Sequence, residues 1–184
     1  MMRPDLQTSL TRSHIEAAKL STFQRILLTT DGTLTEILEA YLFEQINMVK
    51  LSEKLISLKQ DVPYLELNSG SEVIERKILL QGKISRKNFI YAESLLVPER
   101  LEEKFHKELL KSQTPLGRLW LEHKMETFKE IVDSVEESAG ELASYFKIER
   151  EDRMLSRTYR VFSNRQPIMM ITEKFPESYF RKDF

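Results

Sequence analysis

The sequence of 184 residues contains no cysteine, and this absence excludes several kinds of chemistry. Without cysteine there is no disulfide bond, no thiol nucleophile and no cysteine-ligated zinc or iron–sulfur centre. Histidine is scarce too: His14, His106 and His123 are the three present, and their spacing matches no common metal-binding motif. The sequence therefore gives no reason to expect a metal site.

Long apolar runs and an excess of one charge are also lacking. No apolar segment approaches the roughly 20 residues needed to span a membrane. Lys and Arg number 28 against 29 Asp and Glu, a net charge of -1 that argues against a general nucleic-acid binder. With five glycines and six prolines, long flexible linkers are not expected. We predict one cytoplasmic globular domain over residues 1–184, with residues 1–12 loosely ordered.

Apolar residues at helical spacing predict the helices. Residues 31–45 begin with the turn signal Asp31-Gly32 and continue with apolar residues three and four positions apart. Thr33 and Glu36 have the spacing of a capping box. The segments 13–23, 98–111 and 132–146 are expected to be helical as well.

Alternating segments bounded by turn residues predict the strands. The expected strands are residues 48–58, 72–80, 86–97, 153–162 and 167–175. The first strand is expected to be followed by a loop. Strands 72–80 and 86–97 are expected to form one hairpin, and strands 153–162 and 167–175 another. The pattern of residues 119–131 fits helix or strand equally well. Helices combined with an antiparallel sheet indicate an α+β fold.

Two charged residues interrupt apolar faces of these strands. Alternate residues of a strand share a face, so Arg76 lies between Ile74 and Ile78. Glu173 lies likewise in an apolar row of its strand. A buried unpaired charge costs several kcal/mol, so each of these residues needs a partner or a polar cavity.

Two interpretations of these charges stay open. Arg76 and Glu173 could form a structural salt bridge with each other. Alternatively they line a ligand pocket, where the arginine fork holds a carboxylate and the glutamate meets a hydroxyl or a proton in transit. Helix starts at Leu34 and Leu116 would add free backbone N–H groups suited to an anion, although each alone is an ordinary helix start.

Five segments, taken in order, resemble the chorismate lyase (chorismate pyruvate-lyase) family and its archaeal and cyanobacterial members: LTTDGTLTEILEAY, EVIERKILL, FIYAESLLVP, TPLGRLW and RTYRVFSNRQPIMMITEKFP. The resemblance covers about residues 25–179. Its most specific parts are the TPLGR pentapeptide and the closing R-x-Y … P-I … T-E-x-F-P pattern.

The resemblance implies an antiparallel sheet with helices packed against it. It further implies a carbon–oxygen lyase that converts chorismate to 4-hydroxybenzoate and pyruvate in an enclosed pocket without a cofactor. The partner is then a small aromatic or cyclohexadienyl carboxylate. Carried over by motif, Arg76 and the N–H groups of Leu34 and Leu116 bind the carboxylate, and Glu173 acts at the ring hydroxyl. The family also implies a strand over residues 119–131.

A second class of protein shares this fold and the closing hairpin pattern, namely the UTRA ligand-sensing domain of GntR-type regulators. Binding of an aromatic acid without turnover is therefore the alternative function. The TPLGR segment is more typical of the lyases, and the first thirty residues are too few for a winged-helix DNA-binding domain. The acidic segment 126–146 is longer than in the bacterial enzyme, and the residues do not predict its role or the oligomeric state.

Overall fold

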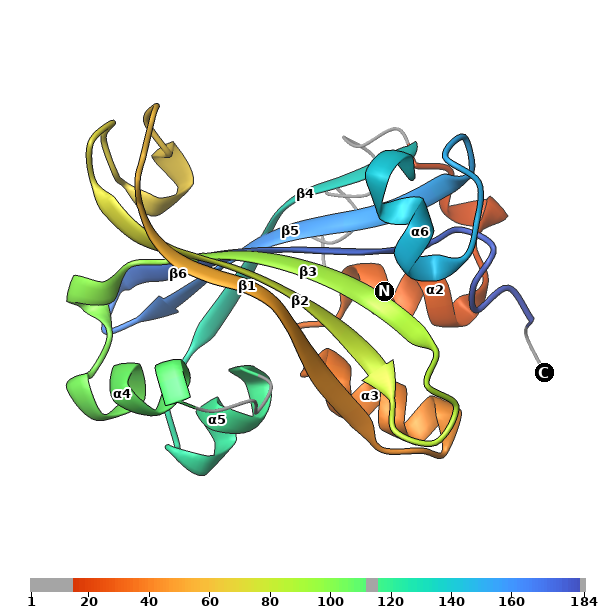
Figure 1. The fold of residues 1–184 in the computed structure, drawn as a ribbon, viewed down its shortest axis with the longest axis horizontal. Coiled ribbons are helices and arrows are strands. Elements are labelled where there is room, and N and C mark those ends of the chain that lie inside the picture. Colours follow the sequence, from red (N-terminus) through yellow and green to blue (C-terminus); the bar gives the residue numbers. More distant parts are fainter. Residues whose placement is uncertain (1–14, 112–115, 183–184) are drawn as a thin grey trace.

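The computed structural model describes residues 15–111 and 116–182. Its centre is a six-stranded antiparallel sheet in the order β1-β2-β3-β6-β5-β4 (Figure 1). The strands are β1 Ile46–Ser57, β2 Glu72–Gly82, β3 Asn88–Leu96, β4 Phe128–Ser138, β5 Arg153–Ser163 and β6 Gln166–Pro176. This sheet confirms the α+β class, and both predicted hairpins are present.

The helices pack mainly against one face of the sheet. They are α2 Thr22–Thr29, α3 Leu34–Leu42, α4 Glu103–Lys111, α5 Leu116–Glu122 and α6 Ala143–Phe146. Short 3-10 turns are η1 Ala17–Lys19, η2 Pro63–Leu65, η3 Pro98–Arg100 and η4 Gly140–Leu142. Apolar side chains of α2 to α5 pack on the face that carries Ile78 and Ile171, here called the inner face, and α6 packs on the other. Figure 1 shows α3, α4 and α5 together on one side of the strands.

Two predictions for the segment between residues 119 and 146 are wrong. The strand expected over 119–131 begins only at Phe128, because Leu116, Leu119 and Trp120 bury their side chains at spacings of three and four and so form α5. The helix expected over 132–146 is strand up to Ser138, where β4 pairs with β5. Only its last residues are helical, in η4 and α6.

The other differences lie nearer the start of the chain. The strand expected over 48–58 has no separate connection, since β1 runs unbroken to Ser57. The helix expected over 13–23 is wrong: the described residues there form the single turn η1, and α2 begins only at Thr22 and runs on to Thr29. Residues 1–12, expected to be loose, lie outside the described part of the chain.

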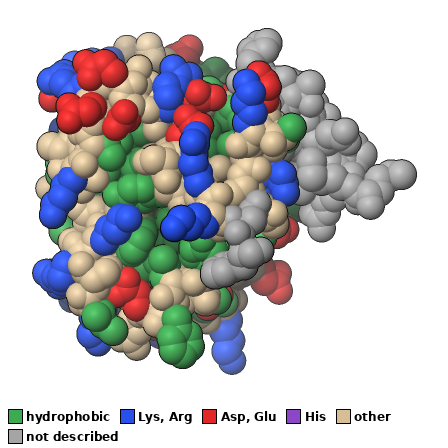
Figure 2. Space-filling view, turned by 90° about the vertical axis from the view of Figure 1, so that its right-hand side faces the viewer, with side chains coloured by type: hydrophobic (Ala, Val, Ile, Leu, Met, Phe, Trp, Pro, Cys, Tyr) green, Lys and Arg blue, Asp and Glu red, His purple; other side chains and the backbone are tan. Residues whose placement is uncertain are grey.

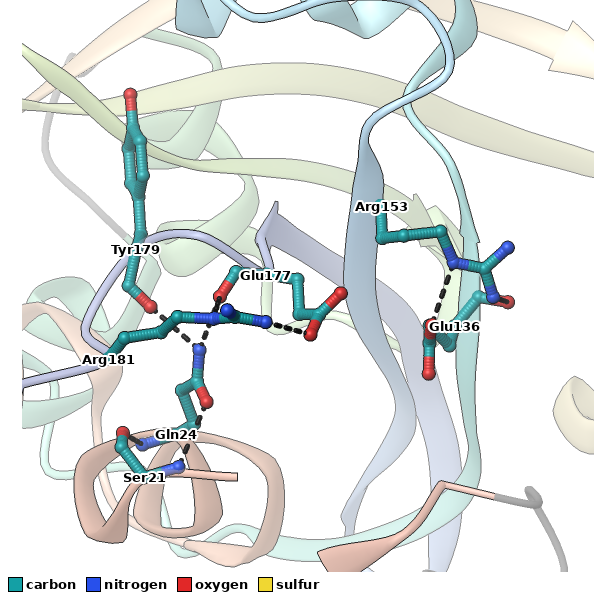
Figure 3. Close-up of polar contacts among 7 residues, drawn as sticks. All are labelled: Ser21, Gln24, Glu136, Arg153, Glu177, Tyr179 and Arg181. Atoms are coloured by element: carbon teal, nitrogen blue, oxygen red, sulfur yellow. Dashed lines mark hydrogen bonds and ion pairs between the residues drawn. The ribbon is translucent and has the colours of Figure 1, made fainter. Parts of the chain in front are cut away.

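The segment after β6 is hydrogen-bonded to the start of α2. Ser21 and Gln24 form a capping box, in which the Ser21 N–H donates to the Gln24 side chain at 3.0 Å. The amide nitrogen of Gln24 then donates to the carbonyls of Glu177 (2.7 Å) and Tyr179 (2.8 Å), as Figure 3 shows. One glutamine side chain thus joins the first described α-helix to the end of the chain.

The surface at this end of the molecule is mixed in character. Apolar side chains gather near the centre of the view in Figure 2, and several Lys and Arg side chains lie around them. None of the helices in the described residues is long and apolar enough to cross a membrane.

Candidate active site

Cross-strand pairing arranges the inward-facing side chains of the inner face in rows, because directly opposite residues of antiparallel strands share a face. Two rows are apolar: Ile74, Leu96, Met169 and Val161 form one, and Leu80, Ile90, Phe175 and Leu155 form the other. Between them lie the row Arg76, Ser94, Ile171 and Tyr159 and the row Ile78, Ala92, Glu173 and Arg157. A charged band therefore crosses the middle of the inner face.

A chamber lies over this band, beneath the first turn of α3 and the side of α5. Its lining includes Thr33, Leu34, Thr35, Leu116, Trp120, Lys129, Tyr159 and Glu173. The space that the centre of a water molecule can reach is about 50 Å³. Since about 10–15 Å³ is enough to seat one water, the chamber has room beyond a single solvent molecule.

Glu173 is held in the chamber wall by two donors. Its carboxylate accepts a hydrogen bond from Arg157 Nε at 2.8 Å and another from the Tyr159 hydroxyl at 3.0 Å. Arg157 in turn donates from Nη1 to the Thr30 carbonyl at 2.6 Å. The cation that Glu173 needs is therefore Arg157, and the first of the two interpretations, a salt bridge between Arg76 and Glu173, is wrong.

Arg76 is buried in the same band with an incomplete set of partners. The side chain is 1% exposed, and its Nε lies 3.3 Å from one carboxylate oxygen of Glu53, whose other oxygen pairs with Lys50. Nη2 donates to Met48 Sδ at 2.9 Å, whereas Nε and Nη1 have no hydrogen-bond acceptor among the described residues. Burial lowers the pKa of the guanidinium, and the charge of Glu53 raises it in part. The group is thus desolvated but only partly neutralised.

The two predicted charged residues share a face without touching. Arg76 and Glu173 lie two strands and one row apart, which places their Cα atoms roughly 12 Å from each other. Glu173 lines the chamber directly. Arg76 stands beside it, because its row neighbour Ser94 and its strand neighbour Ile78 form part of the lining.

Residues at the start of α3 line the chamber. Thr33 is the N-cap, as predicted, but its side chain caps no N–H in the described structure, so the expected capping box is absent. The N–H groups of Leu34 and Thr35, both lining residues, have no acceptor within the helix. Leu116 lines the chamber as the first residue of α5, while Thr114 and Pro115 lie outside the described residues.

Three further polar residues of the site were not predicted. Arg157 and Tyr159 fall in the R-x-Y pattern, and the alternation of β5 could have identified Arg157 as a charge in an apolar row. Burial, and then the nearby Glu173, raise the pKa of Tyr159 well above its usual value, so its hydroxyl stays a donor.

Lys129 is the third. Its Nζ donates to the Gly32 carbonyl at 3.2 Å and lies above the rings of Trp120 (5.2 Å) and Tyr159 (5.4 Å). Burial lowers the pKa of Lys129, and Glu173 partly reverses this effect. An extra residue in β4 disguises the alternation that would have shown Lys129 to point inward.

The arrangement suits an anion. The cations on this face are Arg76, Arg157 and the partly exposed Lys50 of the band, and Lys129 at the end of the neighbouring row, opposite Val161. The carboxylates are Glu53 and Glu173. Positive charge in a partly dry site favours a negatively charged ligand, and guanidinium groups bind carboxylates especially well. Among residues 15–111 and 116–182, no three His, Asp or Glu side chains converge as metal ligands would.

Comparison with known sequences places the chain among lyases. A family model described as "Chorismate pyruvate-lyase Rv2949c-like" matches residues 28–182. The chorismate pyruvate-lyase of Mycobacterium leprae (strain TN) is 32% identical over 175 residues, covering 95% of this chain and 83% of that protein. The enzyme of the same name from Mycobacterium tuberculosis (strain CDC 1551 / Oshkosh) is 32% identical over 170 residues, covering 90% and 85%.

Comparison with solved structures finds the same fold in regulators. The effector domain of PhnF from Mycobacterium smegmatis superimposes with a TM-score of 0.62 at 11% identity, covering 81% of this chain and 91% of that domain. The C-terminal domain of the histidine utilization repressor from Pseudomonas syringae pv. tomato gives a TM-score of 0.57 at 14% identity, covering 76% and 97%. At such low identity these likenesses concern the fold alone.

Proposed function

Because the chain belongs to the family described as "Chorismate pyruvate-lyase Rv2949c-like", we propose that it converts chorismate to 4-hydroxybenzoate and pyruvate in the chamber, without a metal or an organic cofactor. In this reaction the bond between the ring and the ether oxygen breaks, and the ring carbon that bears the hydroxyl loses its hydrogen as a proton. The enolpyruvate that leaves takes up a proton and becomes pyruvate. Since the ring becomes aromatic, the protein mainly has to position the substrate and exclude water.

Arg76 is the proposed anchor for the ring carboxylate. Among the described residues its buried Nη1 has no acceptor and its Nε has only the Glu53 carboxylate at 3.3 Å, so a carboxylate arriving from the chamber would satisfy a group that is otherwise desolvated at a cost. Met48, which Arg76 contacts, packs in the same apolar cluster as Leu34. The N–H groups of Leu34 and Leu116 would then bind the same carboxylate from the other side.

Glu173 is the proposed partner of the ring hydroxyl. Arg157 and Tyr159 fix its position, and each carboxylate oxygen keeps a second lone pair for a further donor. A hydroxyl bound there would have its geminal hydrogen close to a carboxylate, which could assist the loss of the proton. Orientation by Glu173 and anchoring by Arg76 together would hold the ring across the band.

The observation that carries the proposal is the buried Arg76 guanidinium with unsatisfied N–H groups beside a chamber that also contains a fixed carboxylate. The test is to incubate the protein with chorismate and to follow 4-hydroxybenzoate and pyruvate. We expect the two products in equal amounts. Tight binding of an aromatic acid without product would instead favour the sensing function, with which the fold shared with the regulator domains is compatible.

Arg76→Ala supplies the matching binding test. Removing a desolvated bidentate contact should weaken the binding of 4-hydroxybenzoate by about 2–3 kcal/mol, a factor of roughly 30 to 150. The control is Arg150→Ala, which removes an exposed guanidinium. Calorimetric titration that finds the same affinity in both variants would exclude Arg76 as the anchor.

A further inference from the structure

Lys129 is a chamber residue without an ion-pair partner among the described residues. Its Nζ has the Gly32 carbonyl and two aromatic rings as neighbours, and no carboxylate lies within ion-pair distance of it among the described residues. Asp31, the exposed acidic residue of the adjacent turn, acts on Lys129 only as a more distant charge. An ammonium group kept in such a place without an anion is costly unless something else supplies one.

The position of Lys129 is opposite to that of Arg76. Arg76 lies on β2 and Lys129 on β4, four strand spacings away across the sheet, which amounts to roughly 19 Å between their Cα positions. Lys129 lines the chamber on one side, and on the other side Arg76 stands beside the lining residue Ser94, with its guanidinium in contact with Glu53 and Met48. Glu173 lies on a strand between them.

The charges of the band and of Lys129 beside it are out of balance, in the direction that a dicarboxylate would correct. The cations are Arg76, Arg157, Lys129 and the partly exposed Lys50, and the carboxylates are Glu53 and Glu173. Two positive charges are therefore left over among these residues, and Asp31 offsets Lys129 only from a distance. Chorismate carries two carboxylates, one on the ring and one on the enolpyruvyl side chain, whereas 4-hydroxybenzoate carries one.

We propose that Lys129 binds the carboxylate of the enolpyruvyl side chain, and thereby makes the chamber prefer ring dicarboxylates over benzoate-like monocarboxylates. This assignment rests on the proposed function, since it takes the ring carboxylate to lie at Arg76. The rings of Trp120 and Tyr159 would form the flat wall along which the enolpyruvyl group lies. Once the ether bond has broken, the side-chain carboxylate leaves with pyruvate and Lys129 no longer holds the product.

Two stable ligands distinguish binding at Arg76 from binding at Lys129. One is 4-hydroxybenzoate, and the other is 3-[(1-carboxyvinyl)oxy]benzoate, which carries both carboxylates on a ring that is already aromatic. We expect Lys129→Gln, which keeps a donor for the Gly32 carbonyl without the charge, to weaken binding of the dicarboxylate about 10- to 100-fold. Its affinity for 4-hydroxybenzoate should hardly change.

Two more variants complete the experiment. Lys129→Arg keeps the positive charge and should retain most of the dicarboxylate affinity. Lys174→Met removes a positive charge next to Glu173 in the chain but on the opposite face of the sheet, and should leave both affinities unaltered. Equal losses for both ligands in Lys129→Gln, or an unchanged dicarboxylate affinity, would overturn the assignment.

The same measurements distinguish this proposal from the proposed function. If the wild-type protein makes no 4-hydroxybenzoate from chorismate but Lys129→Gln selectively loses the dicarboxylate, the lyase function fails and the Lys129 site stands. If chorismate is turned over and Lys129→Gln shows no selective loss, only the Lys129 site fails. Thermal melting of each variant checks that it is folded.

Discussion

Glu173 illustrates how a buried carboxylate is kept in one position. It touches a guanidinium on one oxygen and a phenol on the other, and both donors come from β5, the strand beside its own. Such charge-assisted contacts are shorter and stronger than neutral ones. A substrate hydroxyl that reaches Glu173 therefore meets an acceptor that does not have to reorganise.

Glu173→Gln should separate this role from simple binding. The amide keeps the shape of the side chain but removes the negative charge that assists proton loss, so we expect kcat for chorismate to fall about 100-fold or more. Affinity for 4-hydroxybenzoate should fall by less, and steady-state kinetics with product titration measures both. Glu130→Gln on β4, where Glu130 pairs with Arg160, is the control. Full activity in Glu173→Gln would remove Glu173 from the mechanism.

Some of these residues could be predicted and others could not, for a physical reason. Arg76 and Glu173 stand out because a charge breaks the alternation of an otherwise apolar strand face. Arg157 could have been predicted in the same way, because it alternates with Leu155 and Tyr159 on one face of β5. Lys129 lies two residues before a change of register, so the sequence around it does not alternate.

Bulges in the two edge strands set which charges face the site. In β1 the pairing passes from Lys50 opposite Ile78 to Ser52 opposite Lys77, so Leu51 is an extra residue. Because the side-chain period of a strand is two, this insertion turns Glu53 to the inner face, opposite Arg76. Without the bulge Arg76 would lack its only carboxylate within ion-pair distance among the described residues.

The bulge in β4 also explains why that segment was mistaken for a helix. Val132 is the extra residue, so the partners of Tyr159 and Arg157 are Ile131 and Ser134, three positions apart. Spacings of two and three within one segment resemble helical periodicity. The β5–β6 hairpin, which alternates over most of its length, was predicted nearly to the residue.

The contact between α2 and the segment after β6 should contribute to the stability of the fold. Gln24→Ala removes the capping partner of Ser21 and both bonds to the carbonyls of Glu177 and Tyr179. We expect the free energy of unfolding to fall by about 2 kcal/mol, as measured by denaturant titration.

Two further variants test the cause of that loss. Gln24→Glu keeps the capping acceptor but brings a negative oxygen to the two carbonyls, and should also be destabilising. Gln60→Ala, at an exposed position, is the neutral control. A Gln24→Ala protein as stable as the control would show that the contact does not hold the chain end.

For the molecule as a whole, the site depends on segments that are far apart in the chain. Residues 33–35, the middle of β2 and β3, α5 and the last hairpin all contribute to the chamber. They meet because β6, the final strand, inserts between β3 and β5 rather than at an edge. Local patterns contain no information on this strand order, so the lone charges could only suggest a pocket, and the family resemblance was needed to choose it over a salt bridge.

A ligand that fits this assembled site should stabilise the whole fold. At a concentration of 100 times its Kd, 4-hydroxybenzoate should add about 2.7 kcal/mol. For a chain of this size that corresponds to a rise in Tm of about 5–10 °C. The neutral analogue 4-hydroxybenzamide should give little shift at the same concentration, because it lacks the charge that Arg76 needs. Equal shifts for acid and amide would speak against a site built for an anion.

The most direct test of the account is a crystal structure of the protein with 4-hydroxybenzoate bound. We expect the carboxylate within hydrogen-bond distance of Arg76 and of the Leu34 N–H, and the hydroxyl at Glu173. A ligand bound outside the chamber, or one whose carboxylate lies away from Arg76, would contradict it.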